Sequence, residues 1–396
     1  MQTNLQNLYR SEGYRVESIN TNGEQAQVEL LWDDRFAVKC ASCGESMRIN
    51  RKVRQSAMDM PLASAGFVGI VYEAVQGHCR PCGRYQTRRP LDIVEGHQAT
   101  LRLMRHVSLL CRWMPTSRVC EVLPVTPATA WRYDRYILQT ELPEPKLDGV
   151  EAILIDEKHL GKKGFITTVL NARTGELLYL AEGKDQDSLV GFFSMLSPEQ
   201  KAGIVAVGID RSGAYRAAVE KNLPEAEIVF DKFHIVANYN DVIDKVRRRS
   251  CREANLTDRD FIKGQRYNLF RNPENLTENG KLQLNALLEA NAELNTVYLL
   301  KDSLKQVWCY SYRKCAEKCL LGWIETAVAS SVTELKRFAN GLLEAKDQIL
   351  AYCEHRITSA KIEAFNAAVA RVVTKACGVS NLDYLFLKLR QECLQR

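Results

Sequence analysis

The segment from residue 150 to 231 alternates apolar strands with helices, and this order limits the fold more than any other feature of the chain. Predicted strands cover residues 152–155, 165–170, 177–180, 204–209 and 227–230, and predicted helices cover 185–196 and 213–222. A short turn joins the second and third strands, so the first three strands should form an antiparallel meander. The order β-β-β-α-β-α-β therefore predicts an α/β sheet.

Acidic residues follow three of these strands directly, at Asp156, Asp210 and Asp231. Sheets of this kind hold their sites at strand ends, and carboxylate oxygens can bind the paired divalent cations that serve phosphoryl transfer. A two-metal site needs a third carboxylate beside Asp156 and Asp210. The candidates are Asp231, Glu157 and Glu363. Single acids at strand ends are more often solvated loop residues, so spacing alone leaves both interpretations open.

The composition is that of a folded globular protein. The 396 residues are 46% hydrophobic and 26% charged, which excludes wholesale disorder and allows about two to four domains. A formal net charge of +6 permits nucleic-acid binding without requiring it. No apolar run approaches the ~18 residues of a membrane span, and the first residues do not resemble a secretion signal. We therefore expect a cytoplasmic protein without a membrane partner.

Two Cys-x-x-Cys-Gly motifs lie near the start of the chain, at Cys40 and Cys43 and at Cys79 and Cys82. In a reducing compartment such cysteines are thiols or metal ligands rather than disulfides. Four thiolates satisfy a tetrahedral structural zinc site, so the motifs predict a zinc ribbon-like module with one Zn²⁺. The alternative is a set of four unrelated buried thiols.

Helical periodicity follows in three segments, predicted at 98–113, at 116–123 and from residue 127 onward. Thr126 is a good N-cap for the third helix, and Pro127 suits its first turn. The arrangement is similar to a helix-turn-helix, whose last helix reads base edges in the major groove. Residues that point away from its apolar side are candidates for DNA contact, and they are Thr129, Arg132 and Arg135. An ordinary three-helix packing unit fits the periodicity equally well.

Basic residues cluster between and after the cysteine motifs, which favours DNA binding over simple packing. Arg88 and Arg89 are the candidate phosphate contacts in this cluster. Another basic run, at 245–252, could bind phosphates, but it is more typical of a solvated helix surface unless a site lies near it.

The chain divides into segments of distinct character. The segments are a β-rich zinc-binding module at 1–97, a helix-turn-helix at 98–140, a proline-containing linker at 141–149, an α/β segment at 150–235, an all-helical region at 236–350 and C-terminal helices at 351–396. The first module should begin with a hairpin, whose strands cover 14–19 and 25–32 and whose turn lies at Asn22-Gly23. The last predicted helix, 359–376, ends at Gly378.

Four residues of this last helix share one face, because Glu363, Ala367, Arg371 and Lys375 recur at four-residue spacing. We expect that face to turn toward the sheet and bring the Glu363 carboxylate to the strand-end aspartates. Arg371 and Lys375 would then hold the DNA backbone beside the site. The alternative is that Glu363 forms surface ion pairs with these cations.

Several short motifs also occur in a fixed order along the chain. They are Asp59-Met-Pro61 between the cysteine motifs, Ser117-Arg-Val119, Ile155-Asp-Glu157, Asp210-Arg-Ser-Gly-Ala-Tyr215, Asp231-Lys-Phe-His234, Asn272-Pro-Glu-Asn-Leu-Thr277, and Glu354-His-Arg-Ile357 followed by Glu363 and Asn366. In these motifs the chain resembles the ISL-three family of bacterial insertion-sequence transposases along nearly its whole length. It departs from the family pattern at Ala360 and Cys377, where glycine and an aromatic residue are usual.

The resemblance implies a ribonuclease-H-like catalytic core of the DDE type, split by the all-helical insertion. Its catalytic acids would be Asp156, Asp210 and Glu363, which would hold two Mg²⁺ or Mn²⁺ ions. Asp231 and His234 would lie close to the site and support it.

The function expected on this basis is that of a DNA transposase. It would bind the terminal inverted repeats of its element, cleave DNA strands and join the freed 3′-hydroxyl to target DNA. Its partners would be double-stranded DNA and further copies of the chain, in a homodimer or higher synaptic oligomer associated with the nucleoid. Two alternatives are a non-catalytic, site-specific DNA-binding regulator derived from such an enzyme and a ribonuclease-H-like nuclease.

Overall fold

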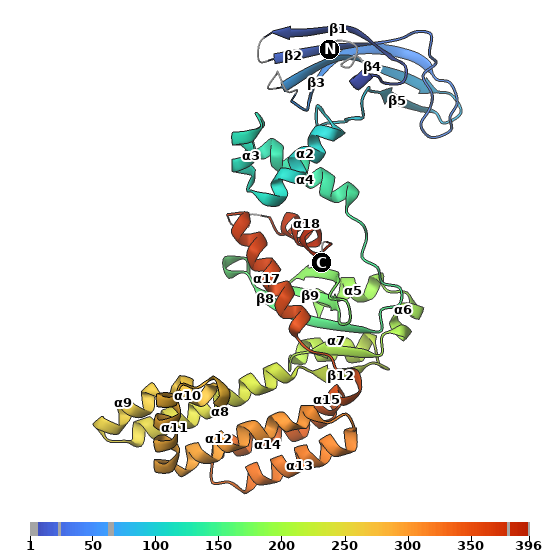
Figure 1. The fold of residues 1–396 in the computed structure, drawn as a ribbon. Coiled ribbons are helices and arrows are strands. Elements are labelled where there is room, and N and C mark those ends of the chain that lie inside the picture. Colours follow the sequence, from blue (N-terminus) through green and yellow to red (C-terminus); the bar gives the residue numbers. More distant parts are fainter. Residues whose placement is uncertain (1–6, 23–24, 62–66, 378–380, 395–396) are drawn as a thin grey trace. The chain divides into compact units, whose positions relative to one another are not determined.

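The fold is described from a computed structural model, which describes residues 7–22, 25–61, 67–377 and 381–394 (Figure 1). The chain forms two compact units. The first unit runs up to Pro143 and also includes the stretch that begins at Ala370, and the second runs from Glu144 to Val369.

The first unit begins with a seven-stranded sheet, in which six strands follow the order β1-β2-β4-β3-β7-β6 and β5 pairs with β4. The strands are β1 (Tyr14–Asn22), β2 (Gln25–Trp32), β3 (Arg48–Asp59), β4 (Phe67–Cys79), β5 (Arg84–Arg88), β6 (Ile93–Val94) and β7 (Ala99–Thr100). The predicted first two strands are confirmed as an antiparallel pair, whereas Gly23 of their predicted turn lies outside the described residues. Alternate side chains of β2 and β4 form the core, among them Val28, Leu30 and Ile70.

Three helices follow the sheet: α2 (Leu101–Trp113), α3 (Thr116–Val122) and α4 (Pro127–Glu141). The predicted N-cap is confirmed, because the Thr126 side chain accepts a hydrogen bond from the amide of Thr129. A buried carboxylate links the helices to the sheet. Asp59, on β3, accepts hydrogen bonds from Thr100 (2.6 Å) and from the guanidinium of Arg102 (2.7 Å).

Helix α18 (Leu382–Cys393) packs on α4 through a polar network around Asp134, which is 0% exposed. The Asp134 carboxylate accepts from Ser108 Oγ (2.6 Å), from Lys388 Nζ (3.0 Å) and from the hydroxyl of Tyr384. The C-terminal stretch from Ala370 is therefore part of the first unit, and the segment predicted as C-terminal helices at 351–396 is shared between the two units. The cause is a set of contacts between residues about 250 positions apart in the chain.

The second unit contains a five-stranded sheet with the order β10-β9-β8-β11-β12. Its strands are β8 (Ala152–His159), β9 (Phe165–Asn171), β10 (Leu177–Glu182), β11 (Ala206–Ile209) and β12 (Glu227–Phe230), and the helices between them are α5 (Val190–Met195), α6 (Pro198–Gly203) and α7 (Gly213–Asn222). Strands β8, β9 and β10 are antiparallel, and β11 is parallel to both β8 and β12. The predicted mixed α/β organisation is confirmed.

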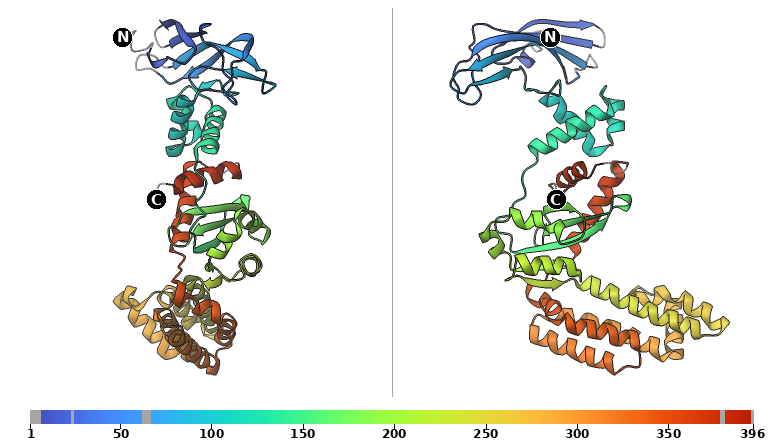
Figure 2. Two further views of the ribbon diagram at one scale, coloured as in Figure 1. Left: turned by 90° about the vertical axis from the view of Figure 1, so that its right-hand side faces the viewer. Right: turned by 180° about the vertical axis from the view of Figure 1, so that it is seen from behind.

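Helix α17 (Ala360–Lys375) lies on one face of this sheet, and α5 and α7 lie on the other (Figure 2). Its packed side consists of Ile362, Phe365 and Val369, which are buried, whereas Glu363 and Ala367 are exposed. The expectation that the Glu363–Ala367 face turns to the sheet is therefore wrong. Apolar side chains take the buried positions, and Glu363 lies at their border.

The helices between β12 and α17 are α8 (Lys232–Glu253), α9 (Leu256–Gly264), α10 (Arg266–Phe270), α11 (Glu278–Ala290), α12 (Ala292–Lys305), α13 (Arg313–Ala329), α14 (Thr333–Glu344), α15 (Lys346–Leu350) and α16 (Tyr352–His355). Tyr239, Trp323 and Phe338 meet edge to face in their core. In the basic run of α8, Arg247 and Arg248 pair with one carboxylate, that of Asp244. The described part of the chain has no helix that is long and apolar enough to cross a bilayer.

Candidate active site and metal centres

Three aspartates lie in a row on adjacent parallel strands. Asp210 and Asp231 directly follow β11 and β12, as predicted, whereas β8 continues past Asp156 to His159 because those residues still pair with β9. Gly208 of β11 pairs with Leu154 of β8, so two residues further on Asp210 stands beside Asp156. On the other side Ile209 pairs with Phe230 of β12, which sets Asp231 beside Asp210. Neighbouring strands lie ~4.8 Å apart, so the three carboxylates start from adjacent positions on one sheet edge.

The carboxylate of Asp156 is half-buried and faces α17. The side-chain amide of Asn366 donates a hydrogen bond to Asp156 Oδ2 at 3.2 Å. Burial raises the pKa of Asp156 and the nearby charge of Asp210 raises it further, while the Asn366 amide acts against this shift. Asp210 in turn accepts a hydrogen bond on Oδ1 from the amide of Ser212 (2.8 Å), which fixes its rotamer at the start of α7.

Glu157 points to the opposite face of the sheet, because successive side chains of a strand alternate. Its Oε2 atom is buried and has no hydrogen-bond partner. Burial raises the pKa of Glu157, and the charges of Asp210 and Asp156 add to the effect. On the same face Tyr215 of α7 is fully buried, and its hydroxyl lies 2.8 Å from Thr167 Oγ1, on the strand residue opposite Glu157.

Asp231 is 8% exposed, and only one of its two carboxylate oxygens accepts a hydrogen bond. Oδ1 accepts from the amide of Phe233 (3.2 Å) and so caps α8, whereas Oδ2 is buried and receives no hydrogen bond. The imidazole Nε2 of His234 lies 3.8 Å from this free oxygen. The structure thus places Asp231 and His234 together beside Asp210.

Glu363 is exposed, and one of its carboxylate oxygens lies 3.4 Å from Ser359 Oγ. At about 100° per residue, Asn366 is about 60° round the helix from Glu363 and one turn further along. The helix that carries Glu363 therefore contacts Asp156, but through Asn366. Among the described residues, Asp156, Asp210 and Glu363 do not form a group whose ligand atoms all lie within 4.8 Å of one another.

Asn366 is a residue of this site to which sequence reasoning assigned no role. It belongs to the motif that begins at Glu354, and it stands three residues after Glu363. Residues three apart share a helix side, so the sequence did hold a signal for it. Which side packs against the sheet was not determined by that spacing.

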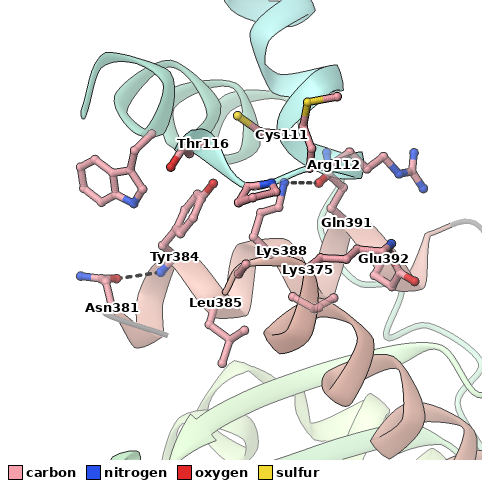
Figure 3. A pocket seen from close by; sticks show the side chains of 15 residues that line it. Cys111, Arg112, Thr116, Lys375, Asn381, Tyr384, Leu385, Lys388, Gln391 and Glu392 are labelled. Carbon is pink, nitrogen blue, oxygen red and sulfur yellow. Dashed lines mark hydrogen bonds and ion pairs between the residues drawn. The ribbon is translucent and has the colours of Figure 1, made fainter. Parts of the chain in front are cut away.

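Arg371 and Lys375, the predicted contacts of α17 with the DNA backbone, both lie near one acid of their own unit. Their side-chain nitrogens lie 3.5 Å and 3.6 Å from the carboxylate of Glu392 on α18. Lys375 also stands over the ring of Trp113, at 5.4 Å from its centroid. Figure 3 shows Lys375 and Glu392 among the side chains that line a pocket between α2, α18 and the end of α17.

The four cysteines of the two motifs converge in the first unit, with all four sulfurs within 4.8 Å of one another. Cys40 Sγ lies 3.9 Å from Cys82 Sγ, and Cys43 Sγ lies 3.5 Å from Cys79 Sγ. The amides of Cys43 and Ser42 point at Cys40 and lower the pKa of its thiol to about 6. Four convergent thiols with amide donors fit a structural Zn²⁺.

Each motif also needs the glycine that follows it. Gly44 and Gly83 have φ of 75° and 63°, a conformation that other residues rarely adopt. These left-handed turns return the chain so that both cysteines of a motif face the same point.

The candidate DNA contacts of the first unit differ in how exposed their side chains are and in the contacts they already make. Arg132 is exposed on α4, whereas Thr129 is half-buried and its hydroxyl lies 2.9 Å from that of Thr126. Arg135 is half-buried with its guanidinium over Trp131. Arg88 is also half-buried. Arg89 pairs with Glu95 at 2.7 Å, and its side chain is 16% exposed.

Comparison with known proteins gives one consistent family. Residues 153–389 match the model of a family described as transposase. The chain is 28% identical over 393 residues to the transposase for insertion sequence element IS1001 of Bordetella parapertussis, which covers 98% of this chain and 97% of that protein. It is 27% identical over 286 residues to the transposase for insertion sequence element IS1557 of Mycobacterium tuberculosis, covering 65% of this chain and 63% of that protein. The chain belongs to the ISL-three family of insertion-sequence transposases.

Proposed function

We propose that this transposase is a DDE enzyme that cleaves DNA at the ends of its element and joins them to target DNA, with Asp156, Asp210 and Glu363 as catalytic acids. The observation that carries the proposal is the contact of α17 with the row of three aspartates, which Asn366 makes with Asp156. Numbered within the sheet, the strand order is 3-2-1-4-5, with the last two strands parallel to the first. This order supports the ribonuclease-H-like interpretation.

The oxygen donors at this sheet edge fit divalent cations. Asp156 and Asp210 are adjacent, and beside them Asp231 Oδ2 is a buried oxygen without a hydrogen-bond donor. Hard oxygen donors of this kind suit Mg²⁺ or Mn²⁺. Asp156, Asp210 and Glu363 would hold two such ions, which would activate the nucleophile and stabilise the leaving oxygen.

The chemistry consists of two displacements at phosphorus. In cleavage, a water oxygen bonds to phosphorus and the bond to the 3′-oxygen breaks, which leaves a 3′-hydroxyl and a 5′-phosphate. In joining, that 3′-hydroxyl attacks a target phosphodiester, and the target strand leaves with a 3′-hydroxyl of its own. The chain's residues orient the acids: Asn366 holds Asp156, the amide of Ser212 holds Asp210, and Asp231 and His234 support the edge beside them.

The first unit would recognise the element's terminal inverted repeats. The zinc-bound cysteines would fix the sheet, and α4 would read bases as the last helix of a helix-turn-helix, with Arg132 exposed for that purpose. Because two ends must be joined, the active form would be a dimer or higher oligomer on double-stranded DNA.

The test is cleavage of a duplex that carries the repeats flanking the gene, followed by joining to a plasmid, in Mg²⁺. Asp156→Asn, Asp210→Asn and Glu363→Gln should each abolish both steps and leave end binding unchanged, because one missing ligand disables the shared ions. Glu325→Gln, which changes an exposed acid of α13, is the matched control and should cleave normally. Cleavage by Glu363→Gln at the normal rate would refute the assignment of the third acid, and Asp231 would be tested next.

The same assay separates the alternative functions. A ribonuclease-H-like nuclease would cleave without forming joined product, and a regulator would bind the repeats without cleaving them. Asn366→Ala should lower the cleavage rate by about 10- to 100-fold, since it removes a partner of a ligand rather than the ligand itself.

A further inference from the structure

The segment Glu354–Ile357 connects the helical region to α17, and three consecutive side chains of it bind three different parts of the second unit. His355 Nε2 lies 2.8 Å from Glu227 Oε2, at the start of β12. Arg356 binds the connection between α12 and α13, and Ile357 packs on β11. The segment therefore joins the helical region and the sheet just before the helix that carries Glu363.

The contact of His355 belongs to a cluster of charged groups. Arg313, in the first turn of α13, lies 3.2 Å from Glu227 and 3.3 Å from Glu354. Glu227, Glu354 and His355 have ligand atoms within 4.8 Å of one another, as a metal site would require. The guanidinium of Arg313 already neutralises both carboxylates, so this cluster is an ion-pair network that ties α13 and α16 to β12.

Arg356 has a backbone conformation that is unfavourable for its residue type. Its φ is 53° and its ψ is 29°, in the left-handed region that costs L-residues other than glycine about 1 kcal/mol. The side chain compensates through three contacts. The guanidinium donates to the carbonyls of Trp308 (3.3 Å) and Tyr310 (3.1 Å) and to Ser311 Oγ (2.8 Å).

Ile357 is buried against Gly208 of β11, which has no side chain to occupy that space. A Cβ atom on Gly208 would lie 2.7 Å from Ile357 Cγ2 and 2.6 Å from a methyl carbon of Leu154. Gly208 stands two residues before Asp210 on β11. The packing of Ile357 therefore sets the start of α17 directly against β11 and β8, the strand that Asp210 follows and the strand that contains Asp156.

We propose that His355, Arg356 and Ile357 are positioning residues, which fix the first turns of α17 and with them the contact of Asn366 with Asp156 and the place of Glu363 one turn before it. Helix α17 begins at Ala360, three residues after Ile357, and the amide of Glu363 donates to the carbonyl of Ser359 at 2.8 Å. This short connection transmits the position of the anchored segment to the helix. The inference rests on the proposed active site and assigns the helical region the role of setting its third acid.

The first measurement is amide hydrogen exchange of the full-length, metal-free protein. Arg356→Ala and Arg356→Gly should each accelerate exchange at 360–368 by at least tenfold, while exchange in α2, α4 and β9 stays unchanged. Arg356→Gly relieves the left-handed backbone but removes the side chain, so it separates the two effects. Arg356→Lys should restore part of the protection, because an ammonium can still donate to the carbonyls. Arg337→Ala, an exposed cation of α14, is the control.

The second measurement is the Mg²⁺ concentration at half-maximal cleavage. A displaced third acid weakens metal binding, so Arg356→Ala should need at least fivefold more Mg²⁺ and recover its maximal rate in excess metal. Wild-type exchange at 360–368 in both Arg356→Ala and Arg356→Gly would overturn the proposal. So would a lower maximal rate at an unchanged Mg²⁺ requirement. Neither result bears on the catalytic acids, whose assignment fails only if their own variants cleave.

Discussion

The attachment of α18 to α4 gives a prediction whose size follows from burial. Asp134 is 0% exposed, and Lys388, its cationic partner, has a side chain that is 12% exposed. Burial and the nearby Asp134 carboxylate raise the pKa of Tyr384, which therefore remains a hydroxyl donor to that carboxylate. Asp134→Asn keeps the shape of the side chain but leaves the Lys388 ammonium buried without a counter-charge.

Breaking a buried ion pair by removing one partner costs about 3–5 kcal/mol. We expect a value near 3 kcal/mol for Asp134→Asn, because the amide oxygen still accepts one hydroxyl. The cost should appear as local detachment of α18, so amide exchange at 382–393 should accelerate by about 100-fold. Removing the second charge as well, in Asp134→Asn with Lys388→Met, should recover most of the protection.

The control lies on the same helix. Glu141→Gln makes the same carboxylate-to-amide change, and its partner Arg105 is 2.8 Å away with both side chains exposed. Exposed pairs contribute about 0–1 kcal/mol, so this variant should change exchange by less than about fivefold. Unchanged protection of α18 in Asp134→Asn would refute the reasoning. Additive effects of the two substitutions would refute it too, because they would show that the charges do not interact.

Three further predictions concern the first unit. Purified protein should contain about one zinc per chain, lost in Cys79→Ser and kept in Cys377→Ser, as elemental analysis would show. Burial opposes ionisation of Asp59, but hydrogen bonds from Arg102 and Thr100 outweigh it and lower its pKa. The ionised Asp59 carboxylate therefore contributes fully to stability above about pH 4, and this contribution is lost as the pH falls through the lowered pKa. In a plot of melting temperature against pH, Asp59→Asn should reduce the fall at acidic pH. Arg132→Ala should weaken binding to the terminal repeat more than to unrelated DNA, whereas Arg88→Ala should weaken both equally, in gel-shift titrations; equal losses would show that α4 does not read bases.

The sequence predicted the five strands of the second unit and the helices at 185–196 and 213–222 because each carries its own periodicity. The short helix α6 was not predicted, and the helices within 236–350 were predicted only as one all-helical region. The apolar runs before Asp156 and Asp210 are buried on both sides, and such runs bounded by turns indicate central strands. The long strand β3 was not predicted. Its first nine residues are exposed on both faces, so they show no alternation and have the composition of a basic loop. Pairing with β4, and not burial, holds them in a strand.

Contacts between segments that are far apart in the chain could not be predicted from the spacing of residues within a motif. The contact between Asn366 and Asp156 spans 210 residues, and that between Tyr384 and Asp134 spans 250. Four-residue spacing identified which residues of α17 share a side, but the apolar residues Ile362, Phe365 and Val369 decide which side is buried. A count of apolar against polar positions around the helix would have predicted this.

Both ends of the helical region attach where the acids are. It leaves the sheet at Asp231, which caps α8 beside Asp210, and it returns through Ile357, which packs on Gly208 of the neighbouring strand. A segment that leaves and returns at one sheet edge can be long without disturbing the strand order, so the sheet keeps its topology. Because α17 follows the return point by only a few residues, and Arg313 and His355 bind the same carboxylate of β12, we expect a movement of α13 or α16 to shift Glu363 relative to Asp156 and Asp210.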